Sequence, residues 1–292
     1  MSSNVKEITV LSGKGGTGKT SLVGALAALI SDKILVDCDV DAPDLHLLLN
    51  PEIQQRESFI GGKKAVVIPE LCTACGRCRE VCRFEAIDEN YRVDSTACEG
   101  CGVCHHFCPF DAIEFSPAVC GEWFVSQTRF GPMVHAQLGA GQENSGLLVA
   151  LIRGKARDLA EERGLPLILV DGPPGIGCPV ISSLTGVDRV LIVTEPTLSG
   201  LHDLDRVVGL ANYFKIPGSV LINKFDLNRE MAVRIEAYCR EKGLGLAGNL
   251  PYDPAVTEAM IQGKTILEWS RNGLGAQVRT IWEKMQENLL KD

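Results

Sequence analysis

The segment Gly13–Thr20 (GKGGTGKT) holds the residues best suited to bind phosphate groups. It fits G-x-x-x-x-G-K-[ST], in which glycines let the backbone turn so tightly that successive N–H groups point at one anion. In this pattern the lysine, here Lys19, reaches the terminal phosphates, and the hydroxyl, here Thr20, binds Mg²⁺. The other nucleotide-binding candidates of the loop and the first helical turn are Gly13, Lys14, Gly15, Gly16, Thr17, Gly18 and Ser21.

Carboxylates end two strands that the sequence predicts. The apolar run Lys33–Asp39 (KILVDCD) contains Asp37 and Asp39, and Pro166–Asp171 (PLILVD) ends in Asp171. Open α/β sheets bind ligands at the carboxyl ends of their strands, and a nucleotide site needs carboxylates near Mg²⁺ and the attacking water. We therefore expect these three acids at the nucleotide site. The alternatives are helix caps or a solvated turn for the first two, and an ordinary strand end for Asp171.

Two further positions follow predicted strands. Gly175, in the turn Asp171–Gly175 (DGPPG), is expected to offer its N–H to the terminal phosphate. Asn223 lies at the end of the strand Ser219–Lys224 (SVLINK), where an amide can both donate to and accept from a purine edge. An ordinary polar turn explains Asn223 equally well.

Eight of the twelve cysteines lie between Cys72 and Cys108. The pattern C-x2-C-x2-C-x3-C occurs twice there, with every matched residue displaced by 26 positions, which indicates a duplicated unit. This is the spacing of a bacterial two-[4Fe–4S] ferredoxin, in which the fourth cysteine of each run binds the other cluster. The expected ligand sets are Cys72, Cys75, Cys78 and Cys108 for one cluster, and Cys98, Cys101, Cys104 and Cys82 for the other. Zinc, which also binds C-x2-C pairs, is the alternative.

A sheet with flanking helices must position these residues. Glu7–Leu11 (EITVL) predicts a buried strand before the phosphate-binding loop, and Ser21–Ile30 predicts a helix after it. Further buried strands are predicted at Lys33–Asp39, Pro166–Asp171, Arg189–Glu195, Ser219–Lys224 and Ala247–Asp253. The expected fold class is therefore α/β, a P-loop NTPase with a mainly parallel sheet flanked by helices.

The cysteine repeat interrupts this α/β pattern. We expect a discontinuous ATPase domain over residues 1–66 and 115–292, with an inserted small α+β domain of bacterial-ferredoxin type at 67–114. Residues 115–150 mix turn residues with polar groups, and their pattern indicates no catalytic or binding role.

Composition and charge argue against several classes of partner. The net charge of −8 and the lack of any Lys/Arg-rich run argue against nucleic acid. No signal peptide or membrane span is visible. The C-terminal apolar stripe lacks a basic face and predicts a helix packed on the domain; it consists of Val278, Ile281, Trp282, Met285 and Leu289. We expect a cytoplasmic protein with reduced thiols and no stable membrane insertion.

The motifs GKGGTGKT, DCDVDAPD, DGPPGIG and INK together resemble the MinD/ParA/nitrogenase-iron-protein family of deviant P-loop ATPases, over residues 1–66 and 115–292. With the cysteine repeat, the whole chain resembles the branch of MinD-type ATPases that contains an inserted ferredoxin domain. The resemblance implies slow, partner-regulated, Mg²⁺-dependent ATP hydrolysis. It also implies a dimer, formed with a second copy or with a paralogue.

The resemblance implies roles for single residues. Lys14 matches the signature lysine, which in this family reaches across a dimer interface to the nucleotide phosphates of the other subunit. Asp39 matches the aspartate that orients the attacking water, and Asp171 the switch carboxylate that binds Mg²⁺, with Asp37 near the metal. Asn223 matches the asparagine that contacts adenine. We expect Lys14 and Asp39, together with the P-loop lysine, to be the catalytic residues.

Cys178 lies seven residues after Asp171. Nitrogenase iron proteins have a cysteine at this distance, and it holds a cluster that bridges two subunits. The surrounding sequence (GPPGIGC) differs, so a bridging ligand and an ordinary buried thiol both remain open.

Three functions are consistent with these features. The first is an ATP-driven redox switch, in which nucleotide binding closes a dimer and the two clusters pass electrons to a redox partner. The second is an iron–sulfur or metallocofactor assembly factor resembling the Mrp/ApbC carriers. The third is a MinD-like positioning or scaffold ATPase whose clusters are structural or sensing. Ligation by eight thiolates in crossed sets favours the first over cluster transfer.

Overall fold

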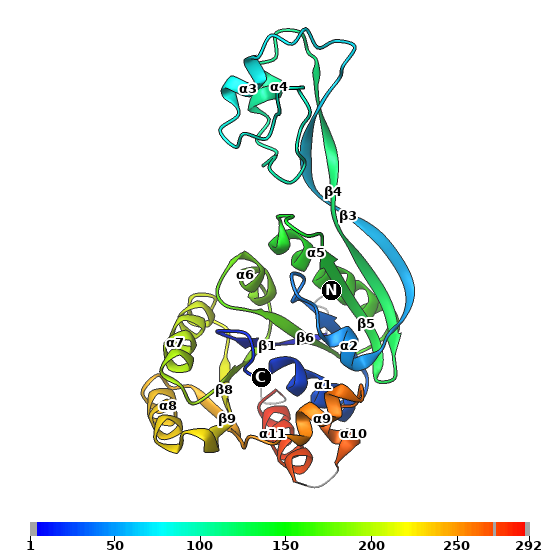
Figure 1. Cartoon of the computed structure of the whole chain (residues 1–292). Coiled ribbons are helices and arrows are strands. Elements are labelled where there is room, and N and C mark those ends of the chain that lie inside the picture. Colours follow the sequence, from blue (N-terminus) through cyan, green and yellow to red (C-terminus); the bar gives the residue numbers. More distant parts are fainter. Residues whose placement is uncertain (1–4, 271–272, 290–292) are drawn as a thin grey trace. The chain divides into compact units, whose positions relative to one another are not determined.

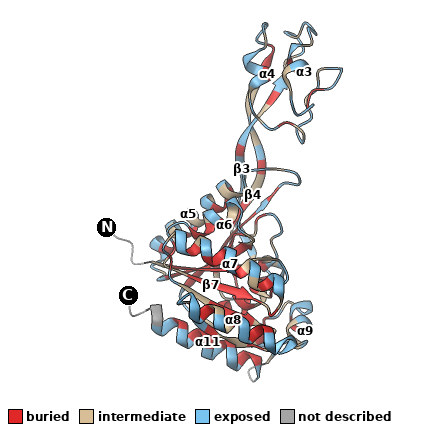
Figure 2. Ribbon diagram, turned by 90° about the vertical axis from the view of Figure 1, so that its left-hand side faces the viewer, coloured by how far each residue is buried: buried red, intermediate tan, exposed pale blue. Residues whose placement is uncertain are grey.

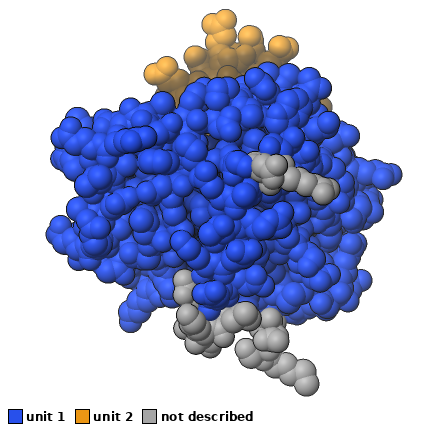
Figure 3. Space-filling view, turned by 90° about the horizontal axis from the view of Figure 1, so that it is seen from below, with its two compact units in different colours: residues 1–56, 123–137, 145–292 blue, residues 57–122, 138–144 orange. Residues whose placement is uncertain are grey.

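The computed structural model describes residues 5–270 and 273–289. The chain folds into two units, shown in different colours in Figure 3. Unit 1 comprises residues 1–56, 123–137 and 145–292, and unit 2 comprises residues 57–122 and 138–144. Unit 2 is therefore wider than the cysteine-rich insertion expected at 67–114, because the strands on either side of the cysteines belong partly to it.

The described residues form a nine-stranded sheet with the order β3-β4-β5-β2-β6-β1-β7-β8-β9 (Figure 1). Its strands are β1 (Lys6–Ser12), β2 (Lys33–Asp37), β3 (Glu52–Val67), β4 (Ile113–Thr128), β5 (Gly131–Leu138), β6 (Leu167–Pro174), β7 (Arg189–Thr194), β8 (Gly218–Asn223) and β9 (Gly245–Leu250). In the part of this order that runs β5-β2-β6-β1-β7-β8-β9, each strand pairs in parallel with its neighbours. Such strands are covered on both faces, which explains their continuous apolar runs.

Helices cover both faces of this sheet in unit 1. They are α1 (Lys19–Leu29), α2 (Leu45–Leu49), α5 (Ser145–Arg163), α6 (Cys178–Leu184), α7 (Leu198–Tyr213), α8 (Arg229–Glu241), α9 (Ala255–Ile261), α10 (Ile266–Trp269) and α11 (Leu274–Leu289). One core joins α1, α2, α10 and α11 to the strands, and a second joins α6, α7 and α8 to the opposite face. Figure 2 shows β7 between these layers; it is buried from Val190 to Thr194.

The predicted strands and helices of the α/β pattern are confirmed, with small differences at their ends. Strand β2 ends at Asp37, so Asp39 lies in the following loop. The region 115–150 forms β4, β5 and the start of α5. In α11 the predicted stripe packs on unit 1, with Val278, Ile281, Trp282 and Met285 buried; the side chain of Leu289 lies outside the described residues. No helix within the described ranges is long and apolar enough to span a membrane.

Unit 2 reflects the duplication seen in the cysteine spacing. Its helices α3 (Arg77–Val81) and α4 (Val103–His106) each begin after a glycine with left-handed backbone, Gly76 (φ 82°) and Gly102 (φ 72°). Cys78, Cys98 and Cys104 lie in a small apolar core of this unit. A ferredoxin fold for unit 2 stays a prediction.

Candidate functional site

The P-loop Gly13–Thr20 connects β1 to α1, as the sequence predicts. Gly16 (φ 79°) and Gly18 (φ 89°) have left-handed backbone, which a residue with a Cβ adopts only with strain. A Cβ at Gly18 would also lie 2.4 Å from Asn223 Nδ2. The loop therefore requires glycine at both positions.

Lys19 is buried and forms an ion pair with Asp171. Its Nζ lies 2.6 Å from Asp171 Oδ1, and the two side chains are 6% and 1% exposed. Burial alone would lower the pKa of Lys19, but attraction to Asp171, Asp37 and Asp39 outweighs it and raises the pKa. The lysine is therefore held as a cation at the base of the loop, next to the acids predicted for the metal.

The three predicted acids come together because β2 and β6 are neighbours. Asp37 and Asp171 are register partners on these two strands. Asp37 accepts hydrogen bonds from the N–H groups of Asp39 (3.1 Å) and Leu45 (3.2 Å), which turn the chain away from the sheet. Burial, reinforced by the charge of Asp171, raises the pKa of Asp37 well above its usual range. Burial also raises the pKa of Asp39, to about 6, against the opposing effect of Lys19.

Two oxygens at this site are buried without a hydrogen-bond partner among the described residues, Asp171 Oδ2 and Thr17 Oγ1. A buried carboxylate oxygen left unpaired is costly, and Mg²⁺ is a cation that takes carboxylate and hydroxyl oxygens as ligands. The donor set therefore fits Mg²⁺, with Asp171 as the carboxylate that has a free oxygen. Thr20 is half-buried at the start of α1, where its expected role places it.

A cavity of about 210 Å³ adjoins the P-loop. Four of the predicted nucleotide-binding residues line it: Gly16, Gly18, Ser21 and Asn223. Sequence reasoning missed the other side of the cavity, formed by apolar residues of α1, β7, β8 and α11 and by Leu250, Pro251, Tyr252, Asp253, Val256, Thr257 and Met260. The rule that ligands bind at the carboxyl ends of strands could have found Pro251–Asp253, since this segment directly follows β9. The mostly apolar lining suits a nucleotide base, and we refer to this cavity as the base cavity.

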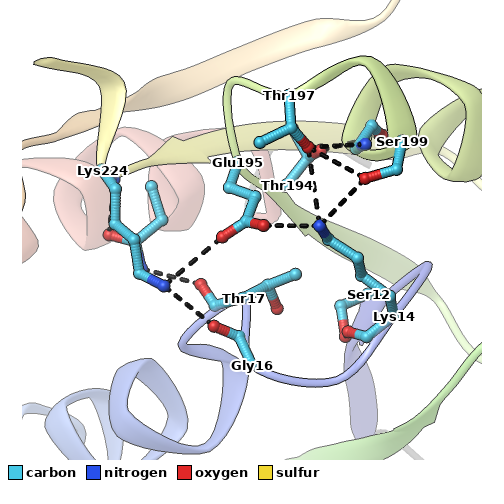
Figure 4. A network of polar contacts seen from close by, with 11 residues as sticks. Ser12, Lys14, Gly16, Thr17, Thr194, Glu195, Thr197, Ser199 and Lys224 are labelled. Atoms are coloured by element: carbon cyan, nitrogen blue, oxygen red, sulfur yellow. Dashed lines mark hydrogen bonds and ion pairs between the residues drawn. The ribbon is translucent and has the colours of Figure 1, made fainter. Parts of the chain in front are cut away.

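Asn223 and Lys224 bond to two consecutive carbonyl groups of the P-loop; Figure 4 labels Lys224 and the two residues that carry these carbonyl groups, Gly16 and Thr17. Asn223 Nδ2 donates to the carbonyl oxygen of Thr17 (2.7 Å), and Lys224 Nζ donates to that of Gly16 (2.9 Å). Asn223 therefore lines the cavity beside the P-loop while its amide is bonded to the loop. Lys224 was not singled out from the sequence.

Lys14 points away from its own loop, toward the start of α7 (Figure 4). Its Nζ lies 2.5 Å from Glu195 Oε1 and 3.1 Å from Ser199 Oγ. Its partners therefore differ from that of Lys19, which pairs with Asp171. No pattern in the sequence indicated Glu195 as its partner.

Gly175 and Cys178 follow β6. Gly175 has left-handed backbone (φ 91°), and its N–H donates to the carbonyl oxygen of Ser12 (3.0 Å). In this arrangement the N–H is bonded to β1, so the predicted contact with a phosphate requires the turn to move. Cys178 is exposed at the first residue of α6, in contrast to the buried thiol considered above.

Two small cavities in unit 2 divide the eight clustered cysteines. One is lined by Cys72, Cys75, Cys78 and Cys108, and the other by Cys82, Cys98, Cys101 and Cys104. These are the two crossed sets that the spacing predicts. Across residues 5–270 and 273–289, no group of three or more His, Cys, Asp or Glu side chains is arranged to hold a metal ion.

Comparison with known proteins places this site in a family. The chain is 32% identical over 286 residues to an uncharacterized protein of Methanocaldococcus jannaschii, with 97% of each covered. Its fold matches that of the septum site-determining protein MinD from Pyrococcus horikoshii, complexed with Mg-ADP (TM-score 0.60, 16% identity, 99% of each chain). It also matches a chain of the MinC:MinD cell division protein complex from Aquifex aeolicus (TM-score 0.58, 18% identity, 97% of this chain and 96% of that one).

The family described as the CobQ/CobB/MinD/ParA nucleotide binding domain matches residues 8–266. This range contains the P-loop, the three acids and Asn223. The chain therefore belongs to the CobQ/CobB/MinD/ParA family and carries its P-loop ATPase domain.

Proposed function

We propose that this ATPase acts as a MinD-like switch, in which bound ATP joins two subunits and hydrolysis releases them. The second subunit is a further copy or a paralogue. The observation that carries the proposal is the position of Lys14. Lys19 already supplies the cation at the base of the P-loop. Lys14, 31% exposed and directed toward α7, is not needed there and would bind a nucleotide outside its own site after leaving its partners near α7.

The base cavity and the acids support the ATPase half of this proposal. Asp171 would hold Mg²⁺ through the oxygen that lacks a partner, and the carboxylate of Asp39 would orient the attacking water. Gly175 would leave Ser12 and bond to the terminal phosphate, which makes the β6–α6 turn sensitive to hydrolysis. Solved relatives with this fold include MinD bound to Mg-ADP and MinD in complex with MinC. A MinD-like role with a protein partner is therefore better supported than electron transfer.

Lys14→Ala tests the dimer. In sedimentation experiments the wild-type chain should dimerise with a non-hydrolysable ATP analogue, and Lys14→Ala should stay monomeric and lose most of its ATP hydrolysis. Lys6→Ala is the control, because Lys6 also belongs to an ion pair, with Asp188, at the start of β1. An unchanged monomer–dimer balance in Lys14→Ala would contradict the proposal.

We also propose that unit 2 holds two [4Fe–4S] clusters, which fits both the ATP-driven redox switch and a MinD-like ATPase whose clusters are structural or sensing. The supporting observation is that each cavity is lined by four cysteines, one from the far copy of the repeat. Burial raises the pKa of Cys78 and Cys104. Cysteines of the same set raise it further: Cys72 and Cys75 for Cys78, and Cys98, Cys101 and Cys82 for Cys104. A bound cation centre would stabilise these thiolates. When bound, the clusters would supply one-electron transfer.

Cys108→Ser and Cys82→Ser test the crossed sets. Each should halve the iron and sulfide content of anaerobically purified protein, and each should spare the cluster whose cysteines it does not touch. Cys239→Ser is the control, since Cys239 is a buried thiol of α8 in unit 1. Zinc in place of iron and sulfide would contradict the proposal. Cluster transfer to an apo-acceptor, with no electron transfer that depends on ATP, would favour the assembly factor.

A further inference from the structure

The ammonium group of Lys14 has all its donors occupied within its own subunit. It lies 2.5 Å from Glu195 Oε1, 3.1 Å from Ser199 Oγ and 3.5 Å from Thr197 Oγ1 (Figure 4). A lysine has three N–H donors, so three partners leave none for a phosphate oxygen. The backbone is held as well, since Ser12 Oγ donates to the carbonyl oxygen of Lys14 (2.9 Å).

Glu195 is the partner that makes this position favourable for a cation. Thr197 is the N-cap of α7, and its side chain accepts a hydrogen bond from the N–H of Gly200 (2.9 Å). The N-terminus of a helix carries partial positive charge and disfavours a nearby ammonium group. Two hydroxyls and a helix N-terminus would not retain Lys14 without the carboxylate of Glu195.

Glu195 also has a second lysine within reach. Its Oε2 lies 3.4 Å from Lys224 Nζ, which donates to the carbonyl oxygen of Gly16 in the P-loop. When Lys14 leaves, the carboxylate keeps this neighbour and is not left unpaired. Although its partial burial acts the other way, the two lysines lower the pKa of Glu195, so it is ionised at neutral pH.

We propose that Glu195 is a positioning residue that holds Lys14 inside its own subunit until a second subunit supplies nucleotide phosphates. Joining of two subunits then exchanges one anionic partner of Lys14 for another, while Glu195 turns fully to Lys224. The inference rests on the dimeric switch proposed above and adds the group that restrains its key lysine. It makes Glu195 a brake on dimerisation.

Glu195→Gln tests this in two ways. First, the nucleotide-free chain is treated with a limiting amine-acetylating reagent, and peptide mass spectrometry gives the labelling rate of Lys14. Losing a partly exposed ion pair worth about 1 kcal/mol should raise this rate about fivefold. Second, sedimentation with a non-hydrolysable ATP analogue should show a dimer Kd lower by roughly 25-fold, because each of the two subunits loses one such ion pair.

Glu268→Gln is the matched control. Glu268 pairs with Arg129 at 2.8 Å, with side chains 28% and 32% exposed, and lies outside the proposed site. It should change neither the labelling of Lys14 nor the dimer Kd, whatever its effect on stability.

The possible results separate this inference from the dimer proposal. If the wild type dimerises through Lys14 but Glu195→Gln changes neither measurement, the proposed role of Glu195 is wrong, and the proposal of an ATP-dependent dimer is unaffected. Faster labelling with an unchanged or higher dimer Kd also overturns the brake, because the contact then has no bearing on dimerisation. If the wild type never dimerises with nucleotide, the switch itself fails and the brake with it.

Discussion

Replacing Lys19 by methionine should destabilise the protein even without nucleotide. Methionine is nearly isosteric with lysine, but it lacks the ammonium group. The change therefore removes the ion pair between Lys19 Nζ and Asp171 Oδ1, which lie 2.6 Å apart. It leaves Asp37 and Asp171 as buried register partners on adjacent strands. Removing one member of a buried ion pair costs about 3–5 kcal/mol. We expect a loss near the lower end, about 3 kcal/mol at pH 7, because the acids can take up protons.

The pH dependence of this loss follows from the same acids. Burial already raises the pKa of Asp37 and, to about 6, that of Asp39, and losing the lysine raises both further. The folded variant then binds more protons than the unfolded chain, so its stability falls as pH rises from about 4 through the folded pKa values. The deficit relative to wild type should therefore shrink to roughly 1–2 kcal/mol at pH 5.

Urea unfolding followed by tryptophan fluorescence measures this loss in unit 1 alone, because Trp123, Trp269 and Trp282 all belong to it. Lys33→Met is the matched control. Lys33 is also buried, but its Nζ donates to the carbonyl oxygen of Phe130 (2.5 Å), and burial lowers its pKa to about 8.

The Lys33→Met control should lose only about 1 kcal/mol, because it breaks a hydrogen bond to a neutral carbonyl oxygen and does not leave a buried carboxylate without its cation. It should also show no recovery at pH 5. A loss below about 1 kcal/mol for Lys19→Met at pH 7, or one that is equal at both pH values, would refute the reasoning.

Three further predictions concern the nucleotide site. ATP hydrolysis, measured by phosphate release, should slow as pH falls through about 6, where the carboxylate of Asp39 takes up a proton. Asp39→Asn should be at least about 100-fold slower, and its rate should no longer fall at this pH. A variant whose rate still falls near pH 6 would contradict the assignment of Asp39. Gly18→Ala should weaken ADP binding in calorimetry by at least about tenfold, whereas Gly15→Ala, whose Cβ meets nothing within 4 Å, should fold with unchanged stability. Asn223→Ala should weaken ADP binding about 5- to 30-fold through loss of the bond to Thr17; equal affinity would show that this bond does not order the loop.

Local sequence patterns predicted the centre of unit 1 because its strands are buried on both faces and therefore read as continuous apolar runs. The same rule that places ligands at strand ends brought Asp37 and Asp171 together correctly. It could not show that β2 stops at Asp37, since the stop depends on the hydrogen bonds that Asp37 itself accepts from Asp39 and Leu45.

Strands β3 and β4 escaped prediction for a different reason. Most of the first half of β3 is exposed and polar, and β4 alternates irregularly between buried and exposed positions. Nothing local in such a segment separates a strand from a loop, because its partners lie far away along the chain. His135 of β5 also has a structural environment that local sequence does not show: its ring bonds to Ser126 Oγ (2.9 Å), and burial lowers its pKa to about 4.

The least predictable features are contacts between side chains that converge from distant segments. The ion pair of Lys14 with Glu195 joins the P-loop to the residue after β7, and the base cavity combines α1 with the segment after β9. Neither has a periodicity or a spacing that a single sequence displays. Both arise only from the order of strands in the sheet.

The bonds from Asn223 and Lys224 to successive P-loop carbonyls have a consequence for how a nucleotide is sensed. The wall of the base cavity and the phosphate cradle share these bonds, so ordering one orders the other. Adenosine and pyrophosphate added as separate fragments should each strengthen binding of the other, although they share no covalent bond. Discrimination between nucleotides then need not come from contacts to the base alone, because a base that fits poorly also weakens the binding of its phosphates by the P-loop.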